Sequence, residues 1–217
     1  AGTGERCSEG PHILKKDGWY YAIVAEGGTG YGHGINIARS RNLYGPYEEC
    51  PYNPVLRQTD PNATIQRSGH GDLVETQKGG WCTYLCGRPN GGHYTTMGRE
   101  TALDPVRWTN DGWFVINDGK PSVEQNMPDL PVEEYDKNTY YDFSKGKISL
   151  DWEWVRNPDN INWSFENGYL KINAQKGWMY NVTAKNILVR REQELSYNAE
   201  TKVMFNPMEK ERKELLL

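Results

Sequence analysis

Residues 8–29 have the sequence SEGPHILKKDGWYYAIVAEGGT, and this stretch decides the fold. Lys16-Asp17-Gly18 separates two short apolar runs, which is the pattern that predicts a two-stranded hairpin. The second run, Trp19–Ala25, is aromatic and β-branched and is suited to a buried strand. Gly10-Pro11 bends the backbone directly after Glu9, and a pair of glycines ends the unit where backbone can approach a ligand. The stretch therefore predicts a strand–turn–strand unit with a carboxylate at its entrance.

A second segment has the same design. Residues 69–87, GHGDLVETQKGGWCTYLCG, again place a short strand after a glycine-marked bend, then a polar turn and a strand that contains tryptophan. Residues 33–48, between the two copies, predict a strand that alternates at Ile35 and Ile37, then a Gly45-Pro46 turn and another short strand. About four strands per repeat is typical of a β-propeller blade rather than of a solenoid coil. We expect a third, partial copy at Trp108–Ile116.

The composition favours an all-β fold and excludes several function classes. The chain has 23 Gly, 12 Pro, 14 Tyr and 8 Trp, a mixture typical of short strands and tight turns. Most of these aromatic rings are expected in the core, although flat rings are also what sugar sites use. A net charge of −4 offers no electrostatic footprint for nucleic acid. No segment approaches about 20 apolar residues, so no membrane partner is predicted.

The four cysteines are expected to be free thiols. Cys82 and Cys86 lie on one face of a predicted strand but too far apart along it for a relaxed disulfide. No spacing typical of a zinc site occurs. Free thiols favour a reducing compartment, such as the cytoplasm.

The sequence predicts two structured regions joined by a linker. Residues 1–120 carry the propeller-like repeats, and residues 121–138 hold three prolines and a run of acids that are typical of a linker. From residue 139 to residue 217 short strands resume with a different rhythm, and the tail 208–217 is expected to be a frayed or helical end. The strands expected in this last region are 141–143, 152–154, 163–165, 169–172, 187–189 and 201–205.

Four motifs resemble those of glycoside hydrolase family 43. They are the Glu-Gly-Pro-His motif at 9–12, Lys-Asp-Gly-Trp-Tyr-Tyr at 16–21, Ala-Glu-Gly-Gly-Thr at 25–29 and Met-Gly-Arg-Glu-Thr at 97–101. Members of this family are β-xylosidases, α-L-arabinofuranosidases and related enzymes that act on hemicellulose. The resemblance implies an all-β fold, part of a five-bladed β-propeller followed by an incomplete β-sandwich.

Glu9 is the candidate general acid. Glycoside hydrolysis needs one carboxylic acid to protonate the leaving oxygen and a second carboxylate to activate water or attack the sugar. Glu9 lies at a strand–turn junction, where apolar aromatic surroundings would keep it protonated. The alternative is an ordinary exposed turn glutamate. The resemblance implies the acid, because the matching glutamate of the family has that role.

His70 is the second candidate, a substrate-binding residue, because its glycine neighbours leave the imidazole room to reach a central cavity. The alternative is a hydrogen-bonded structural histidine. In the family the matching histidine lies at the centre of the propeller, facing water and often a calcium ion. Calcium prefers oxygen ligands, so His70 would contact a calcium ion at most through water. No cofactor is required for the expected chemistry.

Two further residues are expected to bind the sugar. Arg99 could hold two sugar hydroxyls or pair with the acid, and its alternative is a surface Arg–Glu pair. Thr29 closes the glycine loop, and its family counterpart lines the sugar subsite. The polar residues His33, Arg88 and His93 lie on nearby loops and rank below these.

The chain also departs from the family pattern. In complete members the catalytic base, an aspartate, lies upstream of the Glu-Gly-Pro-His motif, whereas only eight residues precede Glu9 here. We therefore expect a partial chain that carries the acid but not the base. The predicted function is exo-acting hydrolysis of xylo- or arabino-oligosaccharides with inversion. The alternatives are a non-catalytic carbohydrate-binding remnant, or one part of a propeller that self-associates through open sheet edges or pairs with another chain.

Overall fold

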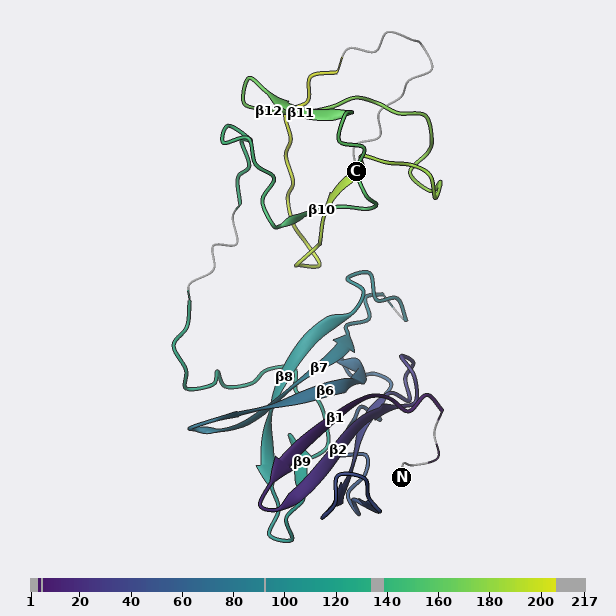
Figure 1. Ribbon diagram of the computed structural model, residues 1–217, viewed down its shortest axis with the longest axis vertical. Coiled ribbons are helices and arrows are strands. Elements are labelled where there is room, and N and C mark those ends of the chain that lie inside the picture. Colours follow the sequence, from purple (N-terminus) through teal and green to yellow (C-terminus); the bar gives the residue numbers. More distant parts are fainter. Residues whose placement is uncertain (1–3, 5, 92, 134–138, 206–217) are drawn as a thin grey trace.

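A computed structural model describes residue 4 and residues 6–91, 93–133 and 139–205. Within these residues every regular element is a strand, which confirms the all-β prediction. Figure 1 shows strands β1 to β9 in one body and β10 to β13 in another. No helix that could cross a membrane occurs in the described part of the chain.

The first sheet is an antiparallel meander in the order β1-β2-β3-β4, with β5 also paired to β3. Its turn between β1 and β2 is the predicted hairpin. Asp17 and Gly18 both have positive φ, 48° and 76°, as a two-residue turn matched to the strand twist requires. The strands are β1 (Glu9–Lys16), β2 (Trp19–Glu26), β3 (Gly34–Ser40), β4 (Glu48–Glu49) and β5 (Leu56–Arg57).

The second sheet repeats this meander in the order β6-β7-β8-β9. Its strands are β6 (Gln66–Thr76), β7 (Gly79–Gly87), β8 (Glu100–Trp108) and β9 (Phe114–Ile116). The two predicted strand–turn–strand units are therefore the first hairpins of two sheets, as expected of propeller blades. The predicted third copy is wrong, because Trp108–Ile116 forms the last hairpin of the second sheet. Phe114, Val115 and Ile116 are buried and complete that sheet rather than begin another.

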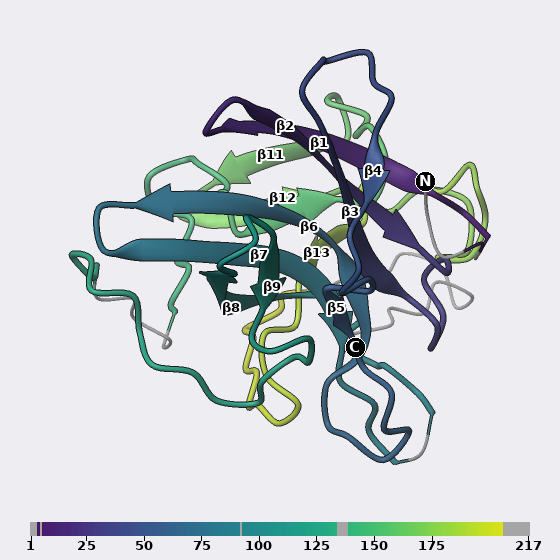
Figure 2. The same ribbon diagram turned by 90° about the horizontal axis from the view of Figure 1, so that it is seen from below.

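The core lies between the two sheets, where β6 packs against β2 and β3. Figure 2 shows β6 and β7 alongside the strands of the first sheet. Gly71 permits the close approach, since a Cβ there would lie 2.7 Å from Cδ1 of Ile35. The fully buried large side chains include Tyr21, Ile23, Ile35, Ile37, Leu56, Tyr84, Phe114 and Ile116.

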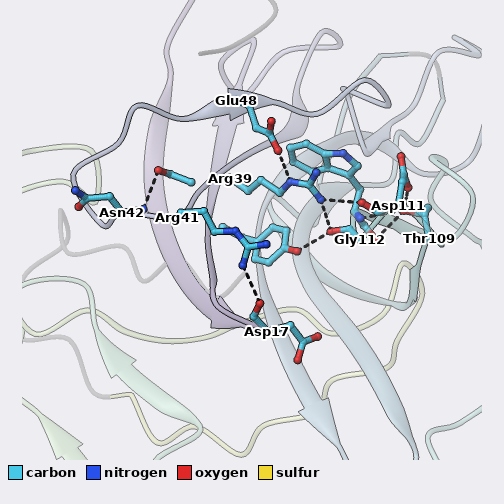
Figure 3. Close-up of polar contacts among 11 residues, drawn as sticks. Asp17, Arg39, Arg41, Asn42, Glu48, Thr109, Asp111 and Gly112 are labelled. Atoms are coloured by element: carbon cyan, nitrogen blue, oxygen red, sulfur yellow. Dashed lines mark hydrogen bonds and ion pairs between the residues drawn. The ribbon is translucent and has the colours of Figure 1, made fainter.

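An arginine clamps the rims of the two sheets together (Figure 3). The guanidinium of Arg39, in β3, lies 4.3 Å from the ring of Trp19 and 4.0 Å from that of Trp113. Its Nη1 donates hydrogen bonds to the carbonyls of Asp111 and Gly112, both at 2.9 Å, across the joint. Cation–π contacts and charged hydrogen bonds of this kind are worth most when partly desolvated. The clamp thus connects the first sheet to the β8–β9 turn.

The second body contains two small sheets. Strand β10 (Trp152–Trp154) pairs with β13 (Leu188–Arg190), and β11 (Trp163–Glu166) pairs with β12 (Tyr169–Ile172) through an Asn-Gly turn. These four strands confirm four of the six predicted in this region.

The strands predicted at 141–143 and 201–205 are absent from the described structure. Phe143 has a φ of 53°, which is incompatible with a strand, and the ring of Tyr141 instead packs edge-on against Trp152. Residues 201–205 pair with no described strand. The expected end 208–217 lies outside the described residues.

Residues 121–133, the described part of the predicted linker, form no strand. The segment is nevertheless anchored at its start. Ser122 N and Gln125 Nε2 donate to the carboxylate of Asp104, at 3.0 and 3.2 Å. Asp104 is fully buried and also accepts a 2.5 Å hydrogen bond from the hydroxyl of Tyr84. A buried carboxylate therefore holds the departing chain against β8.

Candidate active site

Glu9 is the first residue of β1. It pairs with Ala25 of β2, and the register shifts between Glu9 and His12, where Gly10 has a φ of 58°. Because of this irregularity, residues 9–12 depart from the regular pairing of the two strands, as residues at a bulge beside a functional group often do. The Glu9 side chain is 48% exposed. The apolar aromatic surroundings predicted for it are therefore not provided by the described residues.

His70 lies beside Glu9 because β6 is also irregular. The register of β6 shifts on both sides of Gly69, and His70 itself has a φ of 53°. Its Nδ1 lies 4.0 Å from Oε1 of Glu9, an ion-pair distance only when the imidazole is protonated. A Cβ at Gly10 would lie 2.5 Å from Nε2 of His70, so glycine is needed for this approach. The structure thus brings two of the predicted residues together.

The same two strands carry further polar pairs. Nδ1 of His12 lies 3.3 Å from Oδ2 of Asp72, and Nζ of Lys16 lies 2.7 Å from Oε1 of Glu75. Together with Glu9 and His70, these pairs run along β1 and β6, and the acid lies on β1 in the Glu9–His70 pair but on β6 in the other two. Asp72 is consequently engaged by an imidazole.

Glu26, the other carboxylate near the motif, is buried at the end of β2. It accepts hydrogen bonds from Ser8 Oγ at 2.9 Å and from Asn36 Nδ2 at 2.6 Å. A carboxylate held in this way and shielded from solvent is suited to fixing the loop that follows rather than to activating water.

Thr29 and Arg99 lie at the same end of the two sheets as Glu9. Thr29 is exposed in the loop 27–33, which follows the β2 residues paired with Glu9. Arg99 is exposed directly before β8, and its carbonyl accepts a hydrogen bond from the guanidinium of Arg191. Among the described residues no ion pair joins Arg99 to Glu9, so an Arg99 that holds the acid stays a prediction.

Glu100, which follows Arg99 in the motif, pairs with Arg88. Nε and Nη2 of Arg88 both donate to the Glu100 carboxylate, the shortest contact being 2.7 Å. This two-pronged geometry is the favoured one for arginine and carboxylate. Of the other second-rank residues, His93 accepts or donates a 2.9 Å hydrogen bond with the hydroxyl of Tyr31.

His33, placed in the second rank from the sequence, lies inside the structure rather than on a surface loop. Its side chain is completely buried, and Nδ1 lies 3.0 Å from the carbonyl oxygen of Arg67. Nε2 has no hydrogen-bond partner among the described residues. Burial is the largest influence and lowers the pKa of His33, although the Arg67 carbonyl opposes it. In the sequence, the one sign that the His33 side chain points into the core is its position directly after the glycine-containing residues 27–32.

The described residues do not by themselves make a calcium site. Calcium takes roughly six to eight oxygen ligands. No group of three or more His, Cys, Asp or Glu side chains is arranged for a metal within the described ranges. Contact between His70 and calcium through water stays a prediction.

Two family models match the chain. Residues 1–114 match glycosyl hydrolases family 43, and residues 140–213 match a "Beta xylosidase C-terminal Concanavalin A-like domain". The predicted fold class, part of a β-propeller followed by part of a β-sandwich, agrees with both matches.

Known proteins show the same relationship. The chain is 37% identical to xylosidase/arabinosidase 43B of Humicola insolens, covering 95% of this chain and 39% of the relative. It is 38% identical to a non-reducing end α-L-arabinofuranosidase of Bacteroides ovatus, covering 95% and 40%. The chain thus spans about two fifths of the length of these relatives.

Solved structures extend the comparison. The crystal structure of BlXynB from Bacillus licheniformis superimposes with a TM-score of 0.85 at 60% identity, over 88% of this chain and 38% of that one. A xylan β-1,4-xylosidase from Bacillus halodurans has a TM-score of 0.82 at 40% identity, over 89% and 38%.

Proposed function

This chain belongs to glycosyl hydrolase family 43, and we propose that it contributes to hydrolysis of xylan and arabinoxylan oligosaccharides. The activity is exo-acting, that of a β-xylosidase or an α-L-arabinofuranosidase. The observation that carries this proposal is the position of Glu9, half-exposed at the end of two packed sheets and 4.0 Å from His70. The printed names of its relatives, which include both activities, support the substrate class.

In the proposed reaction Glu9 is the general acid. It donates its proton to the glycosidic oxygen as the bond to the anomeric carbon breaks, and water attacks that carbon from the opposite face. In an inverting enzyme the carboxylate that activates this water lies about 6.5–9.5 Å from the acid. Glu26 and Asp72 are unsuited to that role, because each is already engaged. The base is therefore assigned to no residue of this chain.

The remaining residues bind and orient the sugar. Arg99, exposed and without a carboxylate partner among the described residues, presents its guanidinium to sugar hydroxyls. Thr29 offers a hydroxyl from the adjoining loop. His70 packs against Gly10 and limits where the Glu9 carboxyl group can point.

The test is hydrolysis of aryl β-xyloside and aryl α-L-arabinofuranoside by the full chain and by Glu9→Gln. Glu49→Gln, an exposed glutamate of β4, is the matched control. Turnover that disappears only in Glu9→Gln supports the proposal. Measurable and equal turnover in Glu9→Gln and the unaltered chain contradicts it, whereas no turnover in either shows only that this chain does not catalyse the reaction alone.

A second candidate is carbohydrate binding without turnover, which the engagement of Glu26 and Asp72 favours. It predicts no hydrolysis, but a change in tryptophan fluorescence with xylo-oligosaccharide that Arg99→Ala abolishes.

Self-association through open sheet edges is tested by light scattering. Sheet edges that associate would give a mass above 24.9 kDa. A 24.9 kDa species would contradict such pairing.

A further inference from the structure

His33 connects to the candidate acid through a series of close contacts. Its imidazole lies against Gly69 of β6, where a Cβ would be 2.5 Å from Cδ2 of the ring. The next residue, His70, lies in the same way against Gly10, where a Cβ would be 2.5 Å from its Nε2. Glu9 adjoins Gly10. Each imidazole therefore fills the space left by the missing Cβ of a glycine, His33 at Gly69 and His70 at Gly10.

The hydrogen bond of His33 acts on the part of β6 that is out of register. Nδ1 meets the carbonyl of Arg67, whose φ is 56°, and the next positive φ belongs to His70. The register of β6 shifts twice between Gln66 and Gly71. Left-handed conformations at residues other than glycine persist only where the surroundings enforce them. His33 is a buried side chain that contacts this segment at both Arg67 and Gly69.

We propose that His33 is a positioning residue, which holds the irregular segment of β6 so that His70 lies against Gly10 and beside Glu9. This inference deepens the proposed function, because the group positioned is the proposed acid. His33 does not reach the reacting atoms, since it is completely buried.

The surroundings of His33 define its working form. A carbonyl oxygen only accepts, so Nδ1 carries the proton and Nε2 is an acceptor. His70 and Arg57 oppose a positive charge on the ring, whereas Glu9 favours one. Nε2 is buried and has no hydrogen-bond partner among the described residues.

The test is nuclear magnetic resonance of the full chain. The contact between Gly10 and His70 predicts a strong nuclear Overhauser effect between the Gly10 α protons and the His70 ring. We expect His33→Leu to abolish this signal. We expect His33→Asn to keep it, because the asparagine amide nitrogen can donate from the position of Nδ1. His93→Leu, at an exposed histidine, is the control and should keep it.

Three outcomes would overturn the proposal. They are a full-strength signal in His33→Leu, its loss in both His33 variants, or an Nε2-protonated His33 in the ¹⁵N spectrum of the unaltered chain. The protonated nitrogen of His33 is measured on the unaltered chain, so this outcome can be tested even if His33→Leu does not fold. None of these readouts requires hydrolysis, so a Glu9→Gln result that contradicts the proposed function leaves this test standing.

Discussion

Nδ1 of His70 lies 4.0 Å from Oε1 of Glu9, although the two residues belong to different sheets. Both are exposed by about half, and both follow or adjoin a bulge in their strand. The contact exists because β1 and β6 meet where the sheets pack. The candidate acid is thus oriented by the joint between two sheets rather than by its own hairpin.

The proposed acid makes a specific prediction about leaving groups. Protonation by a positioned acid contributes about 10²- to 10⁴-fold, and this benefit matters most when the leaving oxygen is basic. Glu9→Gln should therefore lose about 10²- to 10⁴-fold in kcat/KM on xylobiose and far less on a dinitrophenyl xyloside. Steady-state kinetics on both substrates measure this difference. An equal loss on the two would assign Glu9 to binding rather than to proton transfer.

The Arg39 clamp predicts a loss of stability. Arg39→Met removes two cation–π contacts, two hydrogen bonds to the carbonyls of the opposite sheet and the ion pair with Glu48. We expect the free energy of unfolding to fall by about 2–4 kcal/mol. Urea unfolding measures this quantity. Arg41→Met, which removes one ring contact and one hydrogen bond to the Asp17 carbonyl, both within the first sheet, should cost less, and similar losses in both variants would contradict the clamp.

The buried His33 predicts that stability decreases in acid. The unfolded chain binds a proton at His33 near its ordinary pKa of about 6.5, whereas the folded chain binds it only at lower pH. Below about pH 6.5 the unfolded state therefore holds more protons, and acidification favours it. The urea midpoint should fall less between pH 7.5 and 5.5 in His33→Asn than in the unaltered chain. His93→Asn is the control, and parallel curves for all three would be inconsistent with this account.

The cysteines predict thiol reactivity in two classes. Burial raises the pKa of Cys82 to about 12 and of Cys86 to about 11, and it also raises that of Cys50. Because the thiolate is the reactive form, these three should react slowly at pH 8 until the chain unfolds. Cys7 is exposed and should react at once. Ellman's reagent should count one fast thiol, which Cys7→Ser removes; two or more fast thiols would show that the core opens.

Local patterns in the sequence were enough to predict the hairpins. A two-residue hairpin turn requires positive φ at both of its central residues. Asp17-Gly18 and Asn167-Gly168 adopt positive φ readily, so these residues by themselves indicate the turns. The family motifs in turn identified Glu9, Thr29 and Arg99 as candidates, and the glycines on either side of His70 identified that residue. Local pattern did not show that Trp108–Ile116 completes a sheet, because a hairpin has the same pattern whether it ends one sheet or begins the next.

Contacts between sheets were decided only by the tertiary structure. His33, just before β3, meets Arg67 of β6, and His70 of β6 approaches Glu9 of β1, so both contacts join segments of different sheets. The pairing of Arg88 with Glu100 likewise joins the end of β7 to the start of β8. Periodicity says which face of a strand is buried, but not which side chain of another strand meets it. The sequence by itself therefore determined most of the strands, the hairpin turns and the family of this chain. The packing of β6 on the first sheet decided which polar residues lie close together, because the distances between their side chains depend on how the two sheets pack.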